Sequence, residues 1–209
     1  MKRVKSGGKG LFIVFEGVEG CGKSTQVGLL AGHLRRAKRE VVVTGEPGGT
    51  PFGLKLRKML LNGREHLKPE TEVLLYMASR SELVEQVIAP ALKAGKVVIC
   101  DRWLDATLAY QGYGSGVDLE WIRRVAKDVV RGIEPDLRFY LTLPAKEGLR
   151  RAKARGKLDR IESRSLSFHQ KVETGYHRLA RTRRNTHLIP AQSIEGTHAA
   201  IRRIVDRLI

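Results

Sequence analysis

The stretch that decides the fold of this chain reads Gly17-Val18-Glu19-Gly20-Cys21-Gly22-Lys23-Ser24. It matches the pattern G-x-x-x-x-G-K-[ST], and the apolar residues 11–15 in front of it read as a buried strand, which is the context that this pattern requires. The glycines permit backbone angles at which consecutive N–H groups turn inward toward an anion. The stretch therefore predicts a phosphate-binding loop, and not merely a glycine-rich turn between a strand and a helix.

The polar residues of this loop have separate expected tasks. Lys23 would reach the β- and γ-phosphates of a nucleotide, the Ser24 hydroxyl would ligate Mg²⁺, and the helix that begins there would add the positive end of its dipole. The residues expected to hold the phosphates are Gly17, Val18, Glu19, Gly20, Cys21, Gly22, Lys23, Ser24 and Thr25.

The composition indicates one α/β domain. The chain has 209 residues, of which 42% are hydrophobic, which is enough for one core and too few for two ordinary domains. We expect residues 11–209 to form this domain and residues 1–10 to be a disordered basic tail. No run approaches the ~20 apolar residues of a membrane span, so we expect neither a signal peptide nor a membrane anchor.

Cysteine content and charge bear on location and partners. Cys21 and Cys100 are too few for a disulfide framework and fit a reducing compartment, so the expected location is the cytoplasm. The six histidines show no metal-ligand spacing, and no zinc site is expected. The net charge of +17, from 39 Lys and Arg against 22 Asp and Glu, would also suit a nucleic-acid-binding protein. A solvated basic surface is the alternative explanation.

Strand-like and helix-like segments alternate along the chain. Strands are expected at residues 11–15, 41–43, 97–100, 137–143 and 187–189. Helices are expected at residues 24–36, 52–61, 70–92 with a bend near Pro90, 119–130, 145 onward, 166–181 and 198–208. Residues 41–43 should be buried, and Leu54, Leu56, Met59 and Leu60 should pack inward. This alternation predicts an α/β fold in which helices flank a five-stranded parallel sheet on both faces.

A second group of polar residues should face the phosphate loop. Asp101 closes the apolar run 97–100, which is the pattern of a carboxylate that orients Mg²⁺ or its water. Arg102 beside it could hold a second phosphate group. Tyr76 and Arg80 lie four residues apart on one helix and could present an aromatic plane and a guanidinium to one ligand. A core tyrosine and a solvated arginine are the alternative.

A basic segment interrupted by Gly156 covers residues 150–160. In a phosphate-binding protein, such a segment can close as a lid and bring arginines to the charge that develops during phosphoryl transfer. A solvated basic face is the alternative. The expected lid spans about residues 148–162.

Taken together, these residues resemble the bacterial thymidylate kinases, which have a P-loop nucleoside monophosphate kinase fold. The resemblance covers nearly the whole chain and is carried by residues 15–25, Glu46-Pro47-Gly48-Gly49-Thr50, Leu56-Arg57, Ala78-Ser79-Arg80, Asp101-Arg102-Trp103, Leu108-Ala109-Tyr110-Gln111-Gly112 and Leu158-Asp159-Arg160-Ile161-Glu162. It implies transfer of the γ-phosphoryl group of ATP to dTMP for dTTP synthesis, with Mg²⁺, in a homodimer.

The resemblance also implies roles for individual residues. The catalytic residues would be Lys23, Arg102 and Arg155, with Arg155 as the lid arginine because the variable positions of the phosphate loop contain none. Arg151 and Arg160 would support it from the lid. The substrate would be bound by Glu19, Pro47, Arg57, Tyr76, Arg80, Arg102, Thr107, Tyr110 and Gln111, and the metal by Ser24 and Asp101.

By the same resemblance, the base would stack on Tyr76, meet Arg80 at its edge and contact Thr107 and Gln111. The sugar would place its 3′-hydroxyl on Glu19, and Tyr110 would crowd the 2′ position. The acceptor phosphate would be clamped by Arg57 and Arg102, whose forked donors suit phosphate oxygens better than lysine would.

The chain departs from the family pattern at a few positions. Gly45 stands where an arginine usually precedes Glu-Pro-Gly-Gly, Tyr76 replaces the commoner phenylalanine, and residues 141–143 lack the usual aspartate. Two rival functions stay open. One is a kinase for another nucleoside monophosphate, against which the base-side residues argue. The other is a nucleic-acid-stimulated ATPase, which the charge favours but which leaves the lid without a purpose, so a nucleic-acid partner is not expected.

Overall fold

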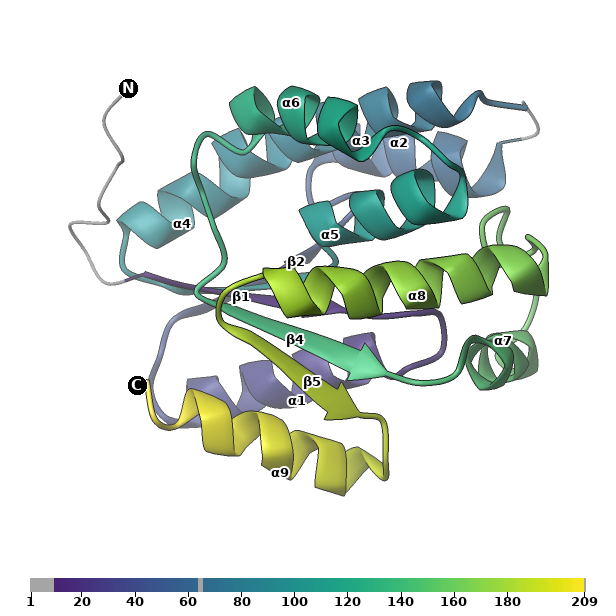
Figure 1. Ribbon diagram of the computed structural model, residues 1–209. Coiled ribbons are helices and arrows are strands. Elements are labelled where there is room, and N and C mark those ends of the chain that lie inside the picture. Colours follow the sequence, from purple (N-terminus) through teal and green to yellow (C-terminus); the bar gives the residue numbers. More distant parts are fainter. Residues whose placement is uncertain (1–9, 64–65, 209) are drawn as a thin grey trace.

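The computed structural model describes residues 10–63 and 66–208, and a parallel five-stranded sheet lies at its centre (Figure 1). The strands are β1 (Leu11–Glu16), β2 (Val41–Gly45), β3 (Val97–Asp101), β4 (Leu137–Thr142) and β5 (Thr186–Pro190), in the order β2-β3-β1-β4-β5. The expected α/β fold with five parallel strands is confirmed.

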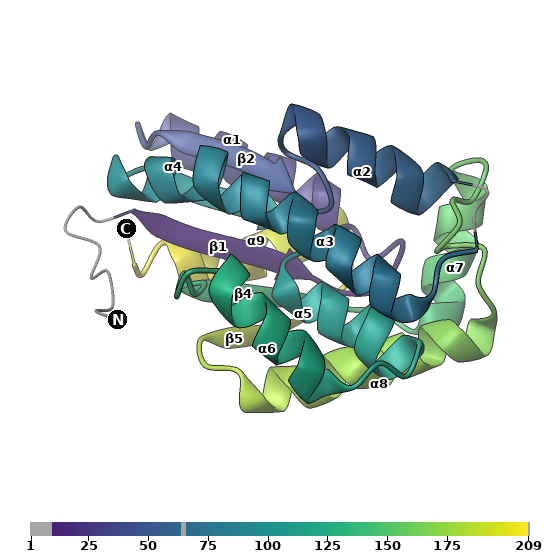
Figure 2. The same cartoon turned by 90° about the horizontal axis from the view of Figure 1, so that it is seen from above.

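Helices cover both faces of this sheet. They are α1 (Lys23–Arg36), α2 (Pro51–Asn62), α3 (Pro69–Leu83), α4 (Ala89–Lys93), α5 (Leu104–Thr107), α6 (Leu119–Val129), α7 (Ala145–Ala154), α8 (Leu166–Thr182) and α9 (Ile194–Val205), with π-helical segments η1 (Val84–Ile88) and η2 (Leu108–Gly114). In Figure 1, α1 and α9 lie below the sheet, and the helices from α3 to α6 lie above it with α8. Figure 2 shows α2 and α3 side by side on the upper layer, and α7 beyond the tips of the strands.

The central strand β1 is buried on both sides. Phe12 and Val14 pack in one apolar cluster with side chains of η1, while Ile13 and Phe15 pack in a second cluster that includes α1. A parallel strand covered on both faces is expected to be apolar throughout, and this explains the continuous run of the sequence.

The carboxyl ends of β1, β2, β3 and β4 lie at the same edge of the sheet. Phe15 and Gly45 are both in register with Asp101, and Glu16 is in register with Tyr140. After β1 the chain adds β2 and β3 on one side of this strand, and it then adds β4 and β5 on the other side. Ligands of open α/β sheets bind at the carboxyl edge beside such a switch point. The fold therefore places the loops after β1, β2 and β3 around one crevice.

Two expectations about burial are wrong. Val43 is 43% exposed, because β2 is an edge strand and one of its faces lacks a full cover. Leu54 and Met59 are 57% and 47% exposed, whereas Leu56 and Leu60 are buried. Only one stripe of α2 can face α3, and the apolar residues outside that stripe remain at the surface.

Helix boundaries differ where local chemistry overrides periodicity. The C-terminal helix starts at Ile194 and not at residue 198, because the Ser193 hydroxyl accepts a hydrogen bond from the Gly196 N–H at 3.0 Å and caps it. The bend expected near Pro90 is a widened turn, in which the Ala89 N–H donates to the Val84 carbonyl. Proline has no N–H to donate, so a π-helical turn before it relieves the mismatch.

The expected tail falls almost entirely outside the described residues, which begin at Gly10. No helix in the described part of the chain is both long and apolar enough to cross a bilayer.

Candidate active site

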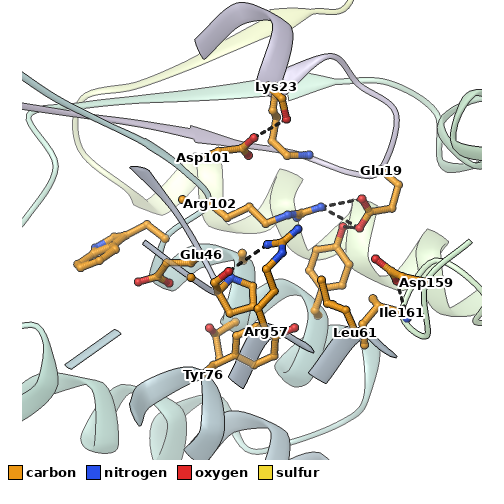
Figure 3. Close-up of a pocket in the computed structure, with 18 of the residues that line it drawn as sticks. Glu19, Lys23, Glu46, Arg57, Leu61, Tyr76, Asp101, Arg102, Asp159 and Ile161 are labelled. Atoms are coloured by element: carbon orange, nitrogen blue, oxygen red, sulfur yellow. Dashed lines mark hydrogen bonds and ion pairs between the residues drawn. The ribbon is translucent and has the colours of Figure 1, made fainter. Parts of the chain in front are cut away.

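A cavity of about 470 Å³ opens at the carboxyl edge of the sheet. Its wall is formed by the loops after β1, β2 and β3, by side chains of α2, α3 and η2, and by the segment after α7. Figure 3 shows Lys23 and Asp101 at one end of the cavity and Tyr76 at the other, with Arg102 between them. The cavity is therefore elongated, with different chemistry at its two ends.

The loop 17–22 at one end is a nest of main-chain amides. Gly17, Gly20 and Gly22 have φ values of 139°, 65° and 93°, in the left-handed region that only glycine adopts without strain. Helix α1 begins directly after Gly22, so its N-terminal N–H groups face the same space. The Lys23 ammonium donates to the carbonyls of Gly17 at 3.0 Å and Val18 at 2.9 Å. This arrangement is built to receive a phosphate group.

Ser24 and Asp101 meet beside this nest. The Ser24 hydroxyl donates to Asp101 Oδ2 at 2.7 Å. Among residues 10–63 and 66–208, no group of three or more His, Cys, Asp or Glu side chains could hold a metal without help. Mg²⁺ is usually held by one or two carboxylates together with phosphate oxygens and water, so this pair of oxygen donors fits Mg²⁺ brought in with a nucleotide.

Arg102 occupies the middle of the cavity. Its Nη2 donates to both oxygens of Glu19 at 2.8 Å, and the Tyr110 hydroxyl donates to Glu19 Oε1 at 2.6 Å. The guanidinium lies 4.8 Å from the centre of the Tyr110 ring. Burial works against the charge of Glu19, but the positive charges of Arg102 and Lys23 outweigh it and lower the pKa of Glu19 to about 2. Glu19 is therefore a carboxylate at neutral pH.

The backbone of Arg102 is strained, with φ at 73°. Glu16 stabilises this strained conformation. Its Oε1 accepts a hydrogen bond from the Trp103 N–H at 2.9 Å, and its Oε2 accepts one from the Tyr176 hydroxyl at 3.1 Å. Arg102 Nη1 lies 3.2 Å from the same Tyr176 hydroxyl. One buried carboxyl group thus fixes both the main chain and the side chain of Arg102. Burial and the nearby Asp105 carboxylate raise the pKa of Glu16 to about 8.

The other end of the cavity combines an aromatic ring with a buried ion pair. Arg80 is 1% exposed, and its Nε donates to the two oxygens of Glu46 at 2.9 Å and 2.8 Å. Arg80 Nη2 also donates to Thr107 Oγ1 at 3.0 Å. Tyr76, one turn earlier on α3, lines the cavity beside it. This end can receive a flat polar ring.

Arg57 lies between the two ends. Its Nη1 donates to the Pro47 carbonyl at 3.0 Å, which holds the side chain in the cavity wall. In Figure 3, the side chains of Arg57 and Arg102 reach toward the same part of the cavity from α2 and from the end of β3. Two guanidinium groups on one space provide an anion site distinct from the main-chain nest.

The segment 148–162 closes one side of the cavity. Arg155 lines it and donates to Glu162 Oε1 at 3.0 Å. Arg151 lies outside the cavity wall, and its Nε donates to Glu147 at 2.8 Å.

Arg160 makes structural contacts in this arrangement of the segment. Its Nε donates to the Leu60 carbonyl and its Nη1 pairs with Glu72, both at 2.8 Å. It braces the segment against α2 and α3 and does not present a free cation to the cavity, because the buried Glu72 carboxylate offers a stronger partner than solvent.

The structure brings most of the residues expected from the sequence into one wall. Every residue expected to bind substrate lines the cavity: Glu19, Pro47, Arg57, Tyr76, Arg80, Arg102, Thr107, Tyr110 and Gln111. From the phosphate loop the wall receives Glu19, Gly20, Gly22, Lys23, Ser24 and Thr25. Val18 and Cys21 instead turn their side chains into the core, and Gly17 contributes its carbonyl to Lys23 and Arg102.

Sequence reasoning missed two buried acids that support the wall, Glu16 and Glu72. Glu16 directly precedes the phosphate loop and is the only acidic residue of an apolar strand, which is a signal that could have been used. Glu72 lies one turn before Tyr76 on the same face of α3, so helical periodicity could have found it.

The fold and the cavity define the class. A strand, a glycine-rich amide nest, a lysine and a Ser–Asp pair form one end of the cavity, and a guanidinium-lined second anion site faces it, as in P-loop kinases of nucleoside monophosphates. A solved thymidylate kinase from Ehrlichia chaffeensis has the same fold, with a TM-score of 0.79 and 32% sequence identity, and the match covers 94% of this chain and 98% of that one.

Sequence comparisons define the family more closely. The family model for thymidylate kinase matches residues 15–201. A thymidylate kinase of Halothermothrix orenii is 43% identical over 196 residues, covering 92% of this chain and 95% of that protein. A thymidylate kinase of a Synechococcus species is 51% identical over 170 residues, covering 81% of each chain. The chain belongs to the thymidylate kinase family.

Proposed function

We propose that this protein transfers the γ-phosphoryl group of ATP to dTMP and forms dTDP and ADP. The observation that carries the proposal is the single cavity in which the Lys23 nest and the guanidinium groups of Arg57 and Arg102 face each other. Direct transfer of a phosphoryl group requires the donor and acceptor phosphates to be held end to end in this way. The similarity to thymidylate kinases supplies the identity of the acceptor.

Catalysis then consists of positioning and charge neutralisation. The amides of the nest and Lys23 hold the donor phosphates, and Arg57 and Arg102 hold the acceptor phosphate. Arg102 gives up its pair with Glu19 in exchange for the phosphate, which leaves the Glu19 carboxylate free to accept the sugar 3′-hydroxyl. Arg155, released from Glu162, moves toward the transferring group as the segment 148–162 closes as a lid.

Mg²⁺ would be held by the Ser24 hydroxyl and the Asp101 carboxylate. When bound, it would neutralise charge on the donor phosphates. The protein's part is to keep the two oxygen donors next to each other at the end of the nest, where their hydrogen bond is now seen.

We further propose a homodimer in the cytoplasm. Helices α2 and α3 pack together and carry the exposed apolar side chains of Phe52, Met59 and Leu74, which a second copy of the chain would cover. Both cysteines are free and buried, as suits a reducing compartment. Light scattering during size-exclusion chromatography measures the oligomeric state.

The function is tested with purified protein, ATP and Mg²⁺, supplied in turn with dTMP, dUMP, UMP, dCMP, CMP or DNA. We expect ADP formation to depend on dTMP and to be matched by dTDP. A clear preference for UMP or CMP would show that the base assignment is wrong. ADP formed only with DNA would replace the kinase by a nucleic-acid-stimulated ATPase, the alternative favoured by the net charge of +17.

A further inference from the structure

Glu72 is a buried carboxylate behind the cavity wall that no step above uses. It is 0% exposed. Its Oε1 pairs with Arg164 Nη2 at 2.7 Å and with Arg160 Nη1 at 2.8 Å. Its Oε2 accepts a hydrogen bond from Gln111 Nε2 at 3.0 Å. The two arginines compensate the burial of the charge, and the second oxygen is left for Gln111.

This contact fixes the orientation of the Gln111 amide. A carboxylate only accepts hydrogen bonds, so the NH₂ group of the amide must face Glu72 and the carbonyl oxygen must face away. Gln111 lines the cavity, and no group in the described part of the chain donates to its Oε1. The wall therefore offers a ligand a hydrogen-bond acceptor at this point, and the opposite orientation would leave two acceptors facing each other.

Arg80 provides the complementary group. Its guanidinium can only donate, and its Nη2 already donates to Thr107 Oγ1, so the threonine hydroxyl keeps a proton to donate. Thr107 and Gln111 lie four residues apart and both line the cavity. Thymine and uracil present an acceptor at O4 and a donor at N3, whereas cytosine presents a donor at N4 and an acceptor at N3. A donor at Thr107, oriented by Arg80, and a fixed acceptor at Gln111 match the first edge and oppose the second.

We propose that Glu72 is a positioning residue that sets the base selectivity of the kinase. By holding the Gln111 amide in one orientation, it makes the pocket favour a pyrimidine with an N3–H over cytosine. Arg160 and Arg164 keep the carboxylate in place for this task. The inference rests on the proposed function, because it requires the base of the monophosphate to lie beside Gln111.

The test compares kcat/KM for dTMP, dUMP and dCMP in the wild type and in Glu72→Gln. Arg160 and Arg164 can only donate, so the new carboxamide keeps its oxygen toward them and turns its NH₂ group toward Gln111. The Gln111 amide then has to reverse and present its own NH₂ group to the cavity. We expect the preference for dTMP over dCMP to fall by about tenfold or more, mainly through KM. The preference for dTMP over dUMP should not change, because both bases share the same edge. Glu70→Gln is the matched control, since Glu70 lies in the same turn of α3 but is exposed.

A double-mutant comparison separates positioning from a structural role. In a Gln111→Met background, Glu72→Gln should change the base preference no further. If Glu72 only stabilised the fold, its substitution would lower activity on all three monophosphates equally, and the inference would be overturned. If Glu72→Gln does not fold, an unchanged preference in Gln111→Met overturns it as well. Failure of the wild type to phosphorylate dTMP would instead refute the proposed function.

Discussion

Arg102 shows how strongly a single residue depends on its surroundings. Its left-handed backbone is held by the Phe15 carbonyl, which accepts the Arg102 N–H at 2.9 Å, and by Glu16, which accepts the next N–H of the chain. Its guanidinium is paired with Glu19. Strain of this kind persists only where neighbours over-determine the conformation, and here it aims a permanent cation into the middle of the cavity.

Arg155 is expected to act mainly in the transition state. Its side chain is 63% exposed and its pair with Glu162 is weak, so the guanidinium is free to move to the charge that develops on the transferring group. Arg155→Ala should lower kcat by roughly 10³-fold, with little change in the KM for dTMP. Steady-state kinetics with Arg150→Ala as control checks this, because Arg150 is exposed and lies outside the cavity wall. Equal, small losses in both variants would remove Arg155 from the mechanism.

The raised pKa of Glu16 predicts how the stability of the protein depends on pH. Its pKa is about 8 in the folded protein against an ordinary value of 4.5, so the folded state binds a proton more tightly. This contribution to stability is fully present below pH 4.5 and is lost as the pH rises through about 8. Relative to Glu16→Gln, which stays neutral, the wild type should lose roughly 1 kcal/mol per pH unit between pH 6 and 8. Urea unfolding of both proteins at several pH values measures this, and parallel curves would contradict it.

At the scale of elements, the sequence predicts the strands of the sheet well and the burial of β2 and α2 less well. The five strands follow from short apolar runs, and the phosphate loop from its glycines. Burial of β2 and α2 could not be predicted in the same way, because it depends on which strand lies at the edge and which helix covers it. The pairs Arg102–Glu19 and Tyr110–Glu19 join positions 83 and 91 residues apart, beyond the reach of any local pattern.

Helix α7 contacts the phosphate loop at two glycines, Gly148 of the helix and Gly20 of the loop. A Cβ at Gly148 would lie 2.2 Å from the Glu19 carbonyl oxygen, and a Cβ at Gly20 would lie 2.3 Å from the Gly148 carbonyl oxygen. This backbone contact couples the start of the proposed lid to the donor site. Because neither glycine has a side chain, the arginine-rich segment can approach the loop closely.

Gly148→Ala should push the helix and the loop apart. We expect a higher KM for ATP and a free energy of unfolding lower by about 1–3 kcal/mol. The matched control is Gly28→Ala in α1, where an added Cβ meets nothing within 4 Å. That control should keep the wild-type kinetics and gain about 0.4–1 kcal/mol of stability. An unchanged KM for ATP in Gly148→Ala would show that the contact does not transmit to the donor site.

At the scale of the molecule, the sheet edge brings together groups from almost the whole length of the chain. The loops after β1, β2 and β3 together with α2 supply the proposed anion sites. Helix α3, with α5 and η2, supplies the proposed base-binding wall, and the segment after α7 closes the side. The sequence could predict residues that line the cavity because the phosphate loop, Asp101 and Arg102 follow recognisable patterns and because the family resemblance supplies most of the other residues. The positions of Glu16 and Glu72 could have been singled out, but the partners of Glu16, Glu46 and Glu72 could not be predicted, since only the fold brings them near.

The central claim is that two nucleotides meet end to end in this cavity and that the phosphoryl group passes directly between them. The most direct test is the stereochemical course of transfer from ATP with an isotopically chiral γ-thiophosphoryl group to dTMP. A single in-line displacement inverts the configuration at phosphorus, and inversion is the predicted result. Retention would require a phosphorylated protein intermediate and two successive transfers, and it would contradict the account.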